Sequence, residues 1–229
     1  MRLEVLADPA AVAIRAAEAI ALDARAAVTS RGRFSIALSG GRTPWAMIQA
    51  LTHLEMPWPH VRVVQVDERI APAGHADRNW SRVKTLLSSR MDDANMAAMP
   101  VESPDLVSAV ERYQKTLSEV AGRPPVLDLV HLGLGVDGHT ASLVPGDAAL
   151  DIEHSDVALT GEYQGRRRMT LTYPVLNRAR HVLWVITGED KAAMLARLLK
   201  RDPTIPAGRV HADHATVIAD RAAASDHKG

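Results

Sequence analysis

An aspartate and a histidine stand two positions apart in the glycine-rich segment Gly135-Val136-Asp137-Gly138-His139. Histidine changes charge near neutral pH, so His139 can act as a general base. A nearby carboxylate can orient the imidazole or stabilise its protonated form. No activated serine or cysteine nucleophile is evident, so water is the natural nucleophile. The pattern favours a hydrolytic reaction, and a histidine that only hydrogen-bonds within a loop is the alternative that these residues leave open.

A second polar segment has the composition of an anion-binding loop. Residues 39–44 read Ser-Gly-Gly-Arg-Thr-Pro, between an apolar run and a helical pattern. Glycines let the backbone approach a ligand, and a helix start presents unpaired N–H groups at the positive end of its dipole. Arg42 and the hydroxyls of Ser39 and Thr43 add donors. The segment lacks the Gly-Lys-Ser/Thr ending of a Walker loop, and a tight turn before a capped helix stays open as an interpretation.

The string from Gly133 to Gly138 matches the G-x-G-x-x-G pattern of dinucleotide-binding enzymes. We reject a dinucleotide site, because that fingerprint needs a long helix directly after it and Pro145 follows within a few residues. Asp137 and His139 also stand where a pyrophosphate has to pack against bare backbone.

The elements that must position these segments alternate between strands and helices. Apolar and β-branched runs predict strands at residues 34–38, 61–66, 126–134, 169–172, 181–187 and 215–219. Helical spacing predicts helices at residues 10–28, 43–54, 77–90, 104–120 and 189–199, the first two after caps at Asp8 and Thr43. This order is typical of a mainly parallel sheet with helices on both faces, in a single α/β domain over residues 1–229.

Three polar clusters each follow a predicted strand, at residues 39–43, 67–69 and 137–139. In sheets of this kind, ligands bind beyond the carboxyl ends of the strands. We therefore expect the three clusters to converge on one rim of the sheet.

The composition of the chain excludes several classes of protein. Lys plus Arg and Asp plus Glu both number 27, so the overall charge gives no argument for a nucleic acid or a membrane as partner. The chain has no cysteine, which excludes a disulfide framework, a thiolate nucleophile and a Cys-type zinc site. No apolar run approaches the ~20 residues that span a bilayer, and the first residues lack the layout of a signal peptide, so we expect a cytoplasmic protein.

Three further polar groups have weaker claims to a functional site. His211, Asp213 and His214 are too close together for all three to reach one ion readily, so we expect no metal site there. The three arginines at 166–168 lie in a chain with few aromatic residues, which favours a solvated turn, with one arginine near the site, over a nucleic-acid patch. Lys191, in the first turn of a predicted helix, suits an anion as partner, and an ordinary surface lysine is the alternative.

Several motifs follow one another along most of the chain. They are Leu-Ser-Gly-Gly-Arg-Thr-Pro at 38–44, Val-Asp-Glu-Arg at 66–69 with Asn79, Gly-Leu-Gly-Val-Asp-Gly-His-Thr-Ala-Ser-Leu-Val-Pro-Gly at 133–146, Arg-Met-Thr-Leu-Thr at 168–172 with Pro-Val-Leu-Asn at 174–177, Gly-Glu-Asp-Lys-Ala at 188–192 and Asp-Arg-Ala-Ala at 220–223. In this order they resemble the glucosamine-6-phosphate isomerase/6-phosphogluconolactonase family, and specifically its lactonase branch.

The resemblance implies a Rossmann-like α/β fold and hydrolysis of 6-phospho-D-glucono-1,5-lactone in the oxidative pentose phosphate pathway, without cofactor or metal. It implies three catalytic residues: His139 as the base that activates water, Asp137 beside it, and Arg69 near the lactone. The implied substrate and phosphate contacts are Ser39, Gly40, Gly41, Arg42, Thr43, Asp67, Asn79, Gly138, Arg168 and Lys191. The partner is then a small sugar-phosphate lactone, with no nucleic acid and no membrane, and we expect a monomer or a weak homo-oligomer.

Two other functions compete with the lactonase interpretation. The isomerase branch shares the phosphate loop and Asp-Gly-His. However, it carries Asp-Glu-Tyr where this chain has Asp-Glu-Arg at 67–69, and an acidic residue where this chain has Val144. Losing that carboxylate removes part of the machinery for proton transfer between carbons, which favours hydrolysis. A non-catalytic sugar-phosphate sensor needs a DNA-binding module, and residues 10–28 read as one helix that leaves no room for a helix-turn-helix.

Three positions depart from the lactonase pattern. Arg42 replaces a residue that is usually small or polar, Val144 stands where Phe is common, and Arg-Asn-Trp at 78–80 replaces Ser-Asn-Tyr. We expect these changes to affect pocket shape and phosphate affinity more than the type of reaction.

Overall fold

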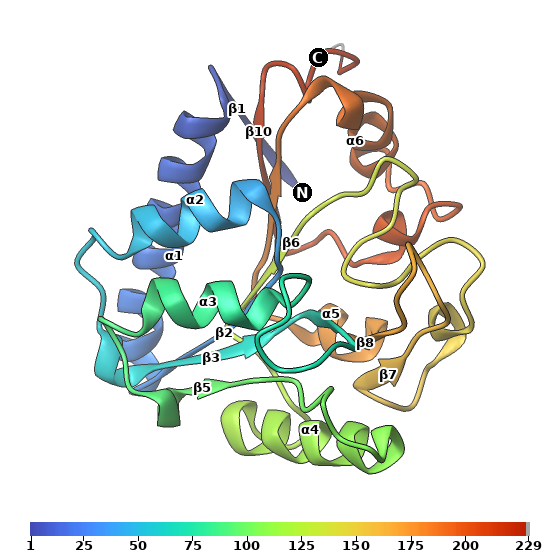
Figure 1. The fold of residues 1–229 in the computed structure, drawn as a ribbon. Helices are drawn as coiled ribbons and strands as arrows, with labels where there is room; N and C mark the ends of the chain where they lie inside the picture. The colour runs from blue at the N-terminus through green and yellow to red at the C-terminus, as the bar shows by residue number, and fades with distance from the viewer. Residues whose placement is uncertain (228–229) are drawn as a thin grey trace.

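A seven-stranded sheet runs through the centre of the computed structural model, which describes residues 1–227 (Figure 1). Its strand order is β1-β10-β9-β6-β2-β3-β5, and every neighbouring pair is parallel. The strands are β1 (Arg2–Leu6), β2 (Phe34–Leu38), β3 (Val61–Gln65), β5 (Met96–Ala97), β6 (Leu129–Leu132), β9 (Val182–Ile186) and β10 (Ala215–Asp220). The predicted parallel α/β architecture is confirmed.

Helices cover both faces of this sheet, as the sequence predicts. The helices of one face are α1 (Pro9–Arg31), α2 (Arg42–Leu51) and α3 (Asn79–Leu87), and those of the other are α4 (Leu106–Ala121), α5 (Tyr173–Arg178) and α6 (Ala192–Leu199). Neighbouring residues of β2 divide between the two cores, with Ile36 in one and Ala37 in the other. A central strand buried on both sides needs apolar residues at successive positions, which is why residues 34–38 are recognisable in the sequence.

The start of α1 confirms the predicted cap at Asp8. The Asp8 carboxylate accepts a hydrogen bond of 2.9 Å from the backbone N–H of Ala11, and Pro9 occupies the first turn. The helix ends at Arg31 and is capped by Gly32, whose φ of 74° suits a residue without a side chain.

The cap predicted at Thr43 is wrong. The N-cap of α2 is Gly41, with a φ of 133°, and Thr43 lies inside the first turn. The Thr43 hydroxyl instead forms a hydrogen bond of 2.7 Å with the hydroxyl of Thr187, which follows β9. The start of α2 therefore keeps its backbone N–H groups clear of a side-chain cap.

A small antiparallel sheet, absent from the sequence-based prediction, lies beside the main one. It has the order β4-β8-β7, with β4 (Asp67–Arg69), β8 (Arg168–Leu171) and β7 (Val157–Leu159). The sequence predicts 67–69 as a polar cluster beyond a strand and 169–172 as a strand of the main sheet. Residues 67–69 do follow a strand, but they also form a short strand themselves, and the second prediction is wrong because β8 pairs with β4 and β7 and not with the main sheet. Pairing across about a hundred residues, rather than local pattern, sets these strands.

Other element boundaries differ modestly from the predictions. The strand predicted at 126–134 narrows to β6, and the helix predicted at 189–199 begins as the 3-10 turn Glu189–Lys191 before α6. The sequence gives no prediction for β1, β5, β7 or α5; β5 has two residues, and β1 is a largely unburied edge strand. Among residues 1–227, no helix combines the length and the apolar character needed to cross a bilayer.

Candidate active site

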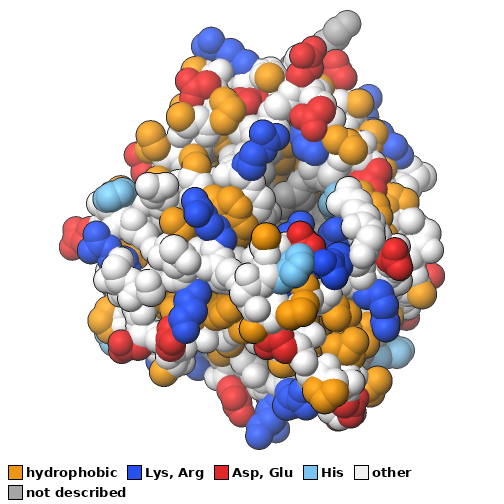
Figure 2. Space-filling view, viewed as in Figure 1, with side chains coloured by type: hydrophobic (Ala, Val, Ile, Leu, Met, Phe, Trp, Pro, Cys, Tyr) orange, Lys and Arg blue, Asp and Glu red, His pale blue; other side chains and the backbone are white. Residues whose placement is uncertain are grey.

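Polar segments gather where β2, β3, β6 and β9 end, and Figure 2 shows a hollow on this face with Lys and Arg side chains around it. A pocket of about 660 Å³ opens here between the starts of α1 and α2 and the segments after β6 and β9. The three predicted clusters follow β2, β3 and β6, which are parallel strands of one sheet, so they lie at the same edge of it. Hydrogen bonds tie the middle cluster to neighbouring segments: Arg69 Nη1 donates to Asn79 Oδ1 (2.8 Å), and the Ser142 hydroxyl donates to Asp67 Oδ2 (2.6 Å). The predicted convergence on one rim is confirmed.

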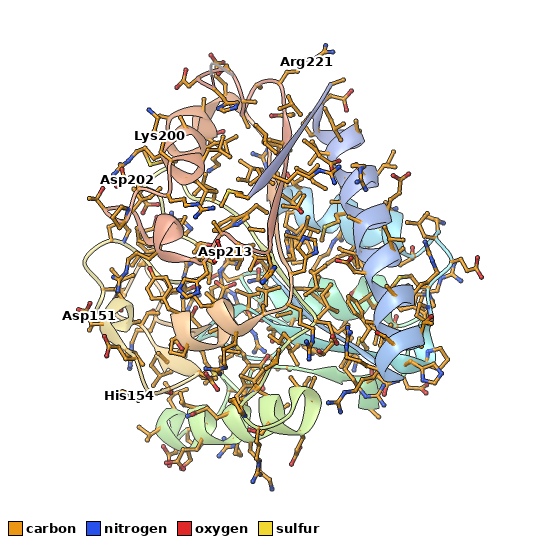
Figure 3. All side chains as sticks on the ribbon, turned by 180° about the vertical axis from the view of Figure 1, so that it is seen from behind. Asp151, His154, Lys200, Asp202, Asp213 and Arg221 are labelled. Carbon is orange, nitrogen blue, oxygen red and sulfur yellow. The ribbon has the colours of Figure 1, made fainter. Side chains whose placement is uncertain are left out.

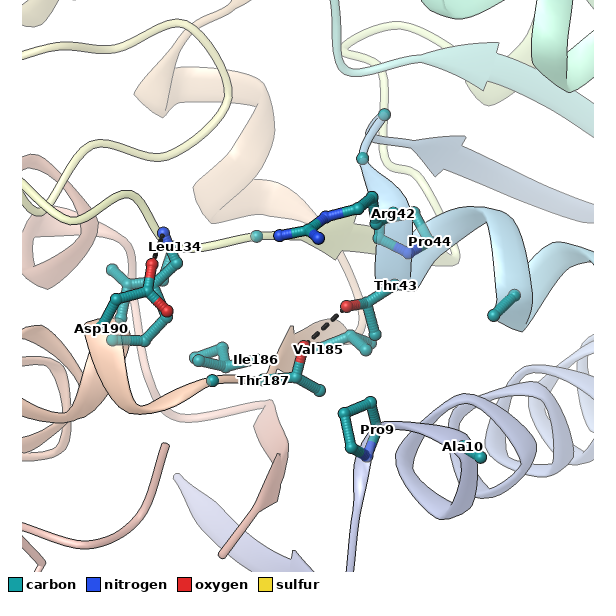
Figure 4. Close-up of a pocket in the computed structure, with 16 residues that line it drawn as sticks. Pro9, Ala10, Arg42, Thr43, Pro44, Leu134, Val185, Ile186, Thr187 and Asp190 are labelled. Atoms are coloured by element: carbon teal, nitrogen blue, oxygen red, sulfur yellow. Dashed lines mark hydrogen bonds and ion pairs between the residues drawn. The ribbon is translucent and has the colours of Figure 1, made fainter. Parts of the chain in front are cut away.

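One end of the site is a cationic pocket at the start of α2. Gly40, Gly41, Arg42, Thr43 and Lys191 all line it. The first turn of α2 has neither a side-chain cap nor an acidic residue, so its N–H groups and dipole favour an anion. In the close-up of this pocket, the side chain of Arg42 extends from α2 across the opening (Figure 4).

The opposite wall of this pocket is tied down by side chains from the ends of β9 and β10. The Thr43–Thr187 hydrogen bond joins the two walls (Figure 4). The Asp220 carboxylate accepts from the N–H of Gly188 at 3.1 Å, which fixes the turn that carries Lys191. Lys191 Nζ lies 3.2 Å from Asp190 Oδ2, an exposed carboxylate that an anionic ligand can replace as partner.

Ser39 occupies a different position from the other residues of its loop. Its hydroxyl donates to the carbonyl of His131 at 2.9 Å, and its N–H donates to His131 Nδ1 at 3.3 Å. Ser39 is buried and does not line the pocket. The hydroxyl therefore anchors the loop to β6, and its expected contact with phosphate stays a prediction.

His131 is the buried support beneath that loop. Its side chain is inaccessible to solvent, and its Nε2 has no hydrogen-bond partner among the described residues. Burial lowers the pKa of His131 to about 3, so the imidazole is neutral and its Nδ1 can accept from Ser39.

The other end of the site holds the Asp137–His139 dyad. Nδ1 of His139 lies 2.6 Å from Asp137 Oδ1, and the same oxygen accepts from the His139 backbone N–H at 3.2 Å. A Cβ on Gly135 would lie 2.0 Å from His139 Nδ1, so only glycine allows the turn to fold back under the ring. Gly138, with a φ of 83°, completes the turn, and its carbonyl accepts from the N–H of Ala207 at 2.9 Å.

The hydrogen bonds of this dyad assign the roles of the two ring nitrogens. Burial alone would raise the pKa of Asp137, but hydrogen bonds and charge from His139, with a hydrogen bond from Tyr163, lower it below its usual value. Asp137 is thus ionised near neutral pH and holds the proton of the imidazole on Nδ1. Nε2 is the ring nitrogen that does not face Asp137.

Two arginines face each other across the small sheet. Arg69 of β4 and Arg168 of β8 are directly paired residues, and like charges at such positions repel. Arg168 is only 5% exposed, and its Nε has no hydrogen-bond partner among the described residues. Burial lowers the pKa of Arg168, which Asp67 partly offsets and Arg69 reinforces. A cationic pair of this kind, with Arg168 buried and Arg69 partly exposed, is suited to a ligand that brings negative charge.

Asp67 and Asn79 form the layer behind these arginines. Both are buried; Asp67 accepts from Ser142, and Asn79 accepts from Arg69 while its amide lies 3.5 Å from the Asp67 carbonyl. A Cβ on Gly40 would lie 2.0 Å from Asn79 Oδ1, so Asn79 also packs against the anion-binding loop. The two ends of the site therefore share one support.

Of the three groups with weaker claims in the sequence, two contribute residues to this hollow, namely Lys191 and Arg168. Asp213 is an exposed residue that pairs with Arg201 at 3.7 Å, and Figure 3 labels it in the view from behind the molecule. Within residues 1–227, no three acidic, histidine or cysteine side chains are arranged to hold a metal ion. Of the three arginines at 166–168, Arg168 reaches the site, as expected for one of them, and Arg166 pairs with Asp77 at 3.0 Å.

Several residues of the site are missing from the sequence-based prediction. They are Ser142, Tyr163, Gln164 and Thr187, each joined to a predicted residue by a hydrogen bond. The pair Gln164-Gly165 signals a turn in the sequence. Nothing in that signal indicates that the turn lies against the dyad.

Comparisons with known proteins identify one family of similar chains. The model of the family described as glucosamine-6-phosphate isomerases/6-phosphogluconolactonase matches residues 7–219. A 6-phosphogluconolactonase from Nostoc sp. is 34% identical over 202 residues, 86% of this chain and 84% of that protein. A 6-phosphogluconolactonase from Homo sapiens is 35% identical over 182 residues, 75% of this chain and 70% of that protein. The structure of 6-phosphogluconolactonase from Trypanosoma cruzi matches with a TM-score of 0.89 and 26% identity, covering 100% of this chain and 97% of that one.

Proposed function

Since the chain belongs to the glucosamine-6-phosphate isomerase/6-phosphogluconolactonase family and has 6-phosphogluconolactonase activity, we propose that His139 activates the water that opens the lactone ring. The observation that carries this role is the 2.6 Å contact between Asp137 and His139 Nδ1, which leaves Nε2 as the basic nitrogen. Asp137 is the partner that stabilises the imidazolium formed during the reaction.

The proposed reaction moves one proton in and out of the imidazole. Nε2 takes a proton from water as the water oxygen bonds to the lactone carbonyl carbon, and the carbonyl oxygen becomes an oxyanion. The tetrahedral intermediate then collapses, the bond to the ring oxygen breaks, and His139 returns its proton to that oxygen. The product is 6-phosphogluconate, and the reaction involves no oxidation or reduction. Arg69 and Arg168 are the cations assigned to the developing charge at this end of the site.

The cationic pocket is assigned to the 6-phosphate. The N–H groups at the start of α2, with Arg42 on one wall and Lys191 on the other, supply donors and charge for a dianion. Binding of the 6-phosphate, which is remote from the reacting carbonyl, holds the lactone against the dyad. The binding energy of the phosphate is thus used to position the reacting groups. In this assignment Ser39 and Asn79 hold the loop, while Gly40, Gly41 and Thr43 line the pocket.

The position of Val144 argues against an aldose–ketose isomerase. Val144 is buried and apolar, so this chain offers no carboxylate where the isomerase pattern has one. Water activation at an ester needs only a base and an oxyanion site, and the hollow contains candidates for both. Hydrolysis therefore uses the groups that are present.

The test compares lactone hydrolysis by the wild type, His139→Ala and His139→Gln, each corrected for spontaneous hydrolysis. We expect kcat to fall by about 10²–10⁴-fold in both variants, the range that general-base catalysis supplies. Undiminished kcat in both variants would remove His139 from the mechanism. Offering glucosamine 6-phosphate in parallel checks the branch, since turnover of that substrate alone contradicts the lactonase assignment.

A further inference from the structure

Tyr163 touches both members of the dyad from outside their own turn. Its hydroxyl donates to Asp137 Oδ2 at 3.0 Å, while Asp137 Oδ1 faces His139 Nδ1 at 2.6 Å. The tyrosine ring meets the imidazole edge to face, with centroids 5.4 Å apart and planes inclined by 67°. Each oxygen of the carboxylate thus has its own partner, and the imidazole has an aromatic wall.

The segment that carries Tyr163 is a tight hairpin held at both sides. Tyr163 and Arg166 exchange two backbone hydrogen bonds, of 3.0 and 3.3 Å, and the two residues between them have φ values of 54° and 74°. Arg166 Nε donates to Asp77 Oδ2 at 3.0 Å, and the Arg168 guanidinium lies 5.1 Å from the centre of the tyrosine ring. The phenol is therefore positioned by its neighbours on both sides.

We propose that Tyr163 is a positioning residue for hydrolysis, acting through Asp137 to hold the imidazole of His139 in the orientation and protonation state that water activation needs. The inference rests on the proposed role of His139 as base. A donor on Oδ2 withdraws charge from the carboxylate, so Asp137 stabilises the imidazolium less strongly and more imidazole stays neutral at a given pH. The same hydrogen bond prevents the carboxylate from rotating away from Nδ1.

The phenol of Tyr163 keeps its proton in this environment of burial and a neighbouring carboxylate. Burial first, and then the hydrogen bond and charge of Asp137, raise the pKa of Tyr163 above its usual value. Tyr163 therefore remains a hydrogen-bond donor over the pH range in which histidine titrates.

The other charges near Tyr163 and the dyad are cationic or paired. Arg168 lies over the phenol ring and opposes the rise of the Tyr163 pKa. Arg69 and Asp67, from β4, act on Arg168 with opposite signs. A substitution at Tyr163 that leaves these charges in place therefore tests the hydrogen bond to Asp137.

The decisive variant is Tyr163→Phe, which keeps the ring and removes the donor. We expect kcat to fall by about tenfold with KM within about twofold, because Asp137 loses the hydrogen bond that keeps its carboxylate facing Nδ1, while the groups assigned to phosphate are unchanged. The acid limb of the kcat/KM profile should move to higher pH, and so should the NMR titration of the His139 ring. Unchanged kcat and unchanged titration would overturn the inference.

A second substitution tests the same hydrogen bond with the opposite sign. Fluorotyrosine at position 163 keeps the shape of the side chain and is a stronger donor, so the acid limb and the NMR titration should move to lower pH. A merely structural side chain predicts no such shift. This measurement also decides the case if Tyr163→Phe folds poorly, and an unshifted titration contradicts the proposal.

Two controls separate this inference from the role of His139. Tyr173→Phe removes a comparable phenol, which donates to the Pro206 carbonyl at 2.9 Å and lies under Arg209; its effect should be on Tm and not on the His139 titration. In a His139→Ala background, Tyr163→Phe should cause no further loss of kcat. Full activity of His139→Ala refutes the proposed base, whereas an inactive His139→Ala beside an unaffected Tyr163→Phe refutes only the role of Tyr163.

Discussion

Replacing Asp137 by asparagine tests how much of the rate depends on its charge. The introduced amide has the shape of the carboxylate and can still accept from His139 Nδ1, which lies 2.6 Å from Asp137 Oδ1 in the wild type. What it lacks is attraction for the imidazolium that forms as water is deprotonated. Opposite charges centred about 4 Å apart interact by about 4 kcal/mol at an effective dielectric constant near 20.

Partial exposure reduces that figure. The side chains of Asp137 and His139 are 32% and 23% exposed, so solvent screening brings the expected loss to about 2–4 kcal/mol. This corresponds to a fall in kcat of roughly 30- to 1000-fold, with KM little changed. The assay follows 6-phosphogluconate release through a coupled dehydrogenase, with spontaneous hydrolysis subtracted.

The matched control is Asp105→Asn, which removes an exposed carboxylate that caps α4. It should alter Tm slightly and leave kcat unchanged. If Asp137→Asn keeps kcat within about threefold of the wild type while its fold is intact, the charge of Asp137 does not contribute to catalysis and the proposed dyad is refuted.

Three further predictions test other parts of the molecule. Lys191→Ala should raise KM by about tenfold or more and leave kcat within a few-fold of the wild type, because it removes one charge-assisted hydrogen bond to the phosphate. The control Lys200→Ala, at the end of α6, should change neither constant. If the two substitutions have equal effects, Lys191 has no specific role in phosphate binding. Gly135→Ala should reduce kcat by about 100-fold or more with a native circular-dichroism spectrum, since the added Cβ would lie 2.0 Å from His139 Nδ1, and a fully active variant contradicts that geometry. Burial lowers the pKa of His131 from 6.5 to about 3 in the folded protein, so between these values the unfolded chain binds a proton that the folded chain does not. The free energy of unfolding is therefore unaffected by this group above pH 6.5. It falls as the pH drops from 6.5 toward 3, by up to about 1.4 kcal/mol per pH unit. Tm measured between pH 7 and 4 should fall less steeply in His131→Gln, and an unchanged slope rejects the buried neutral imidazole.

The central sheet is predictable because its chemistry is local. Residues 34–38 are apolar or small at every position and lie between a charged turn and two glycines, so burial on both faces leaves a readable run. The helix from Pro9 likewise begins with its own cap. When strands and helices alternate, the connections between parallel strands are right-handed, which leaves few possible arrangements of the strands. The edge of the sheet at which the strands end, and where the polar segments gather, can therefore be predicted.

The small sheet and the outer contacts of the site depend on pairing between distant residues. Asp67 to Arg69 is a polar triplet with no apolar pattern, and it becomes a strand only by pairing with β8 about a hundred residues later. Ser39 has a hydroxyl in a plausible phosphate loop, yet the nearest acceptor is a carbonyl of β6. Tyr163 reaches Asp137 across 26 positions, so its residue type and spacing give no sign of that contact.

The opposed arginines of β4 and β8 have a thermodynamic consequence. With Arg69 directly opposite Arg168, the strands bear a repulsion that the free protein has to tolerate. An anion bound between them relieves that repulsion, so ligand affinity and the stability of the small sheet are linked quantities. Local opening of these strands should be more frequent in the free protein, and amide hydrogen exchange in β4 and β8 should slow when 6-phosphogluconate binds. Ligand binding at the site then stabilises the small sheet that forms part of it.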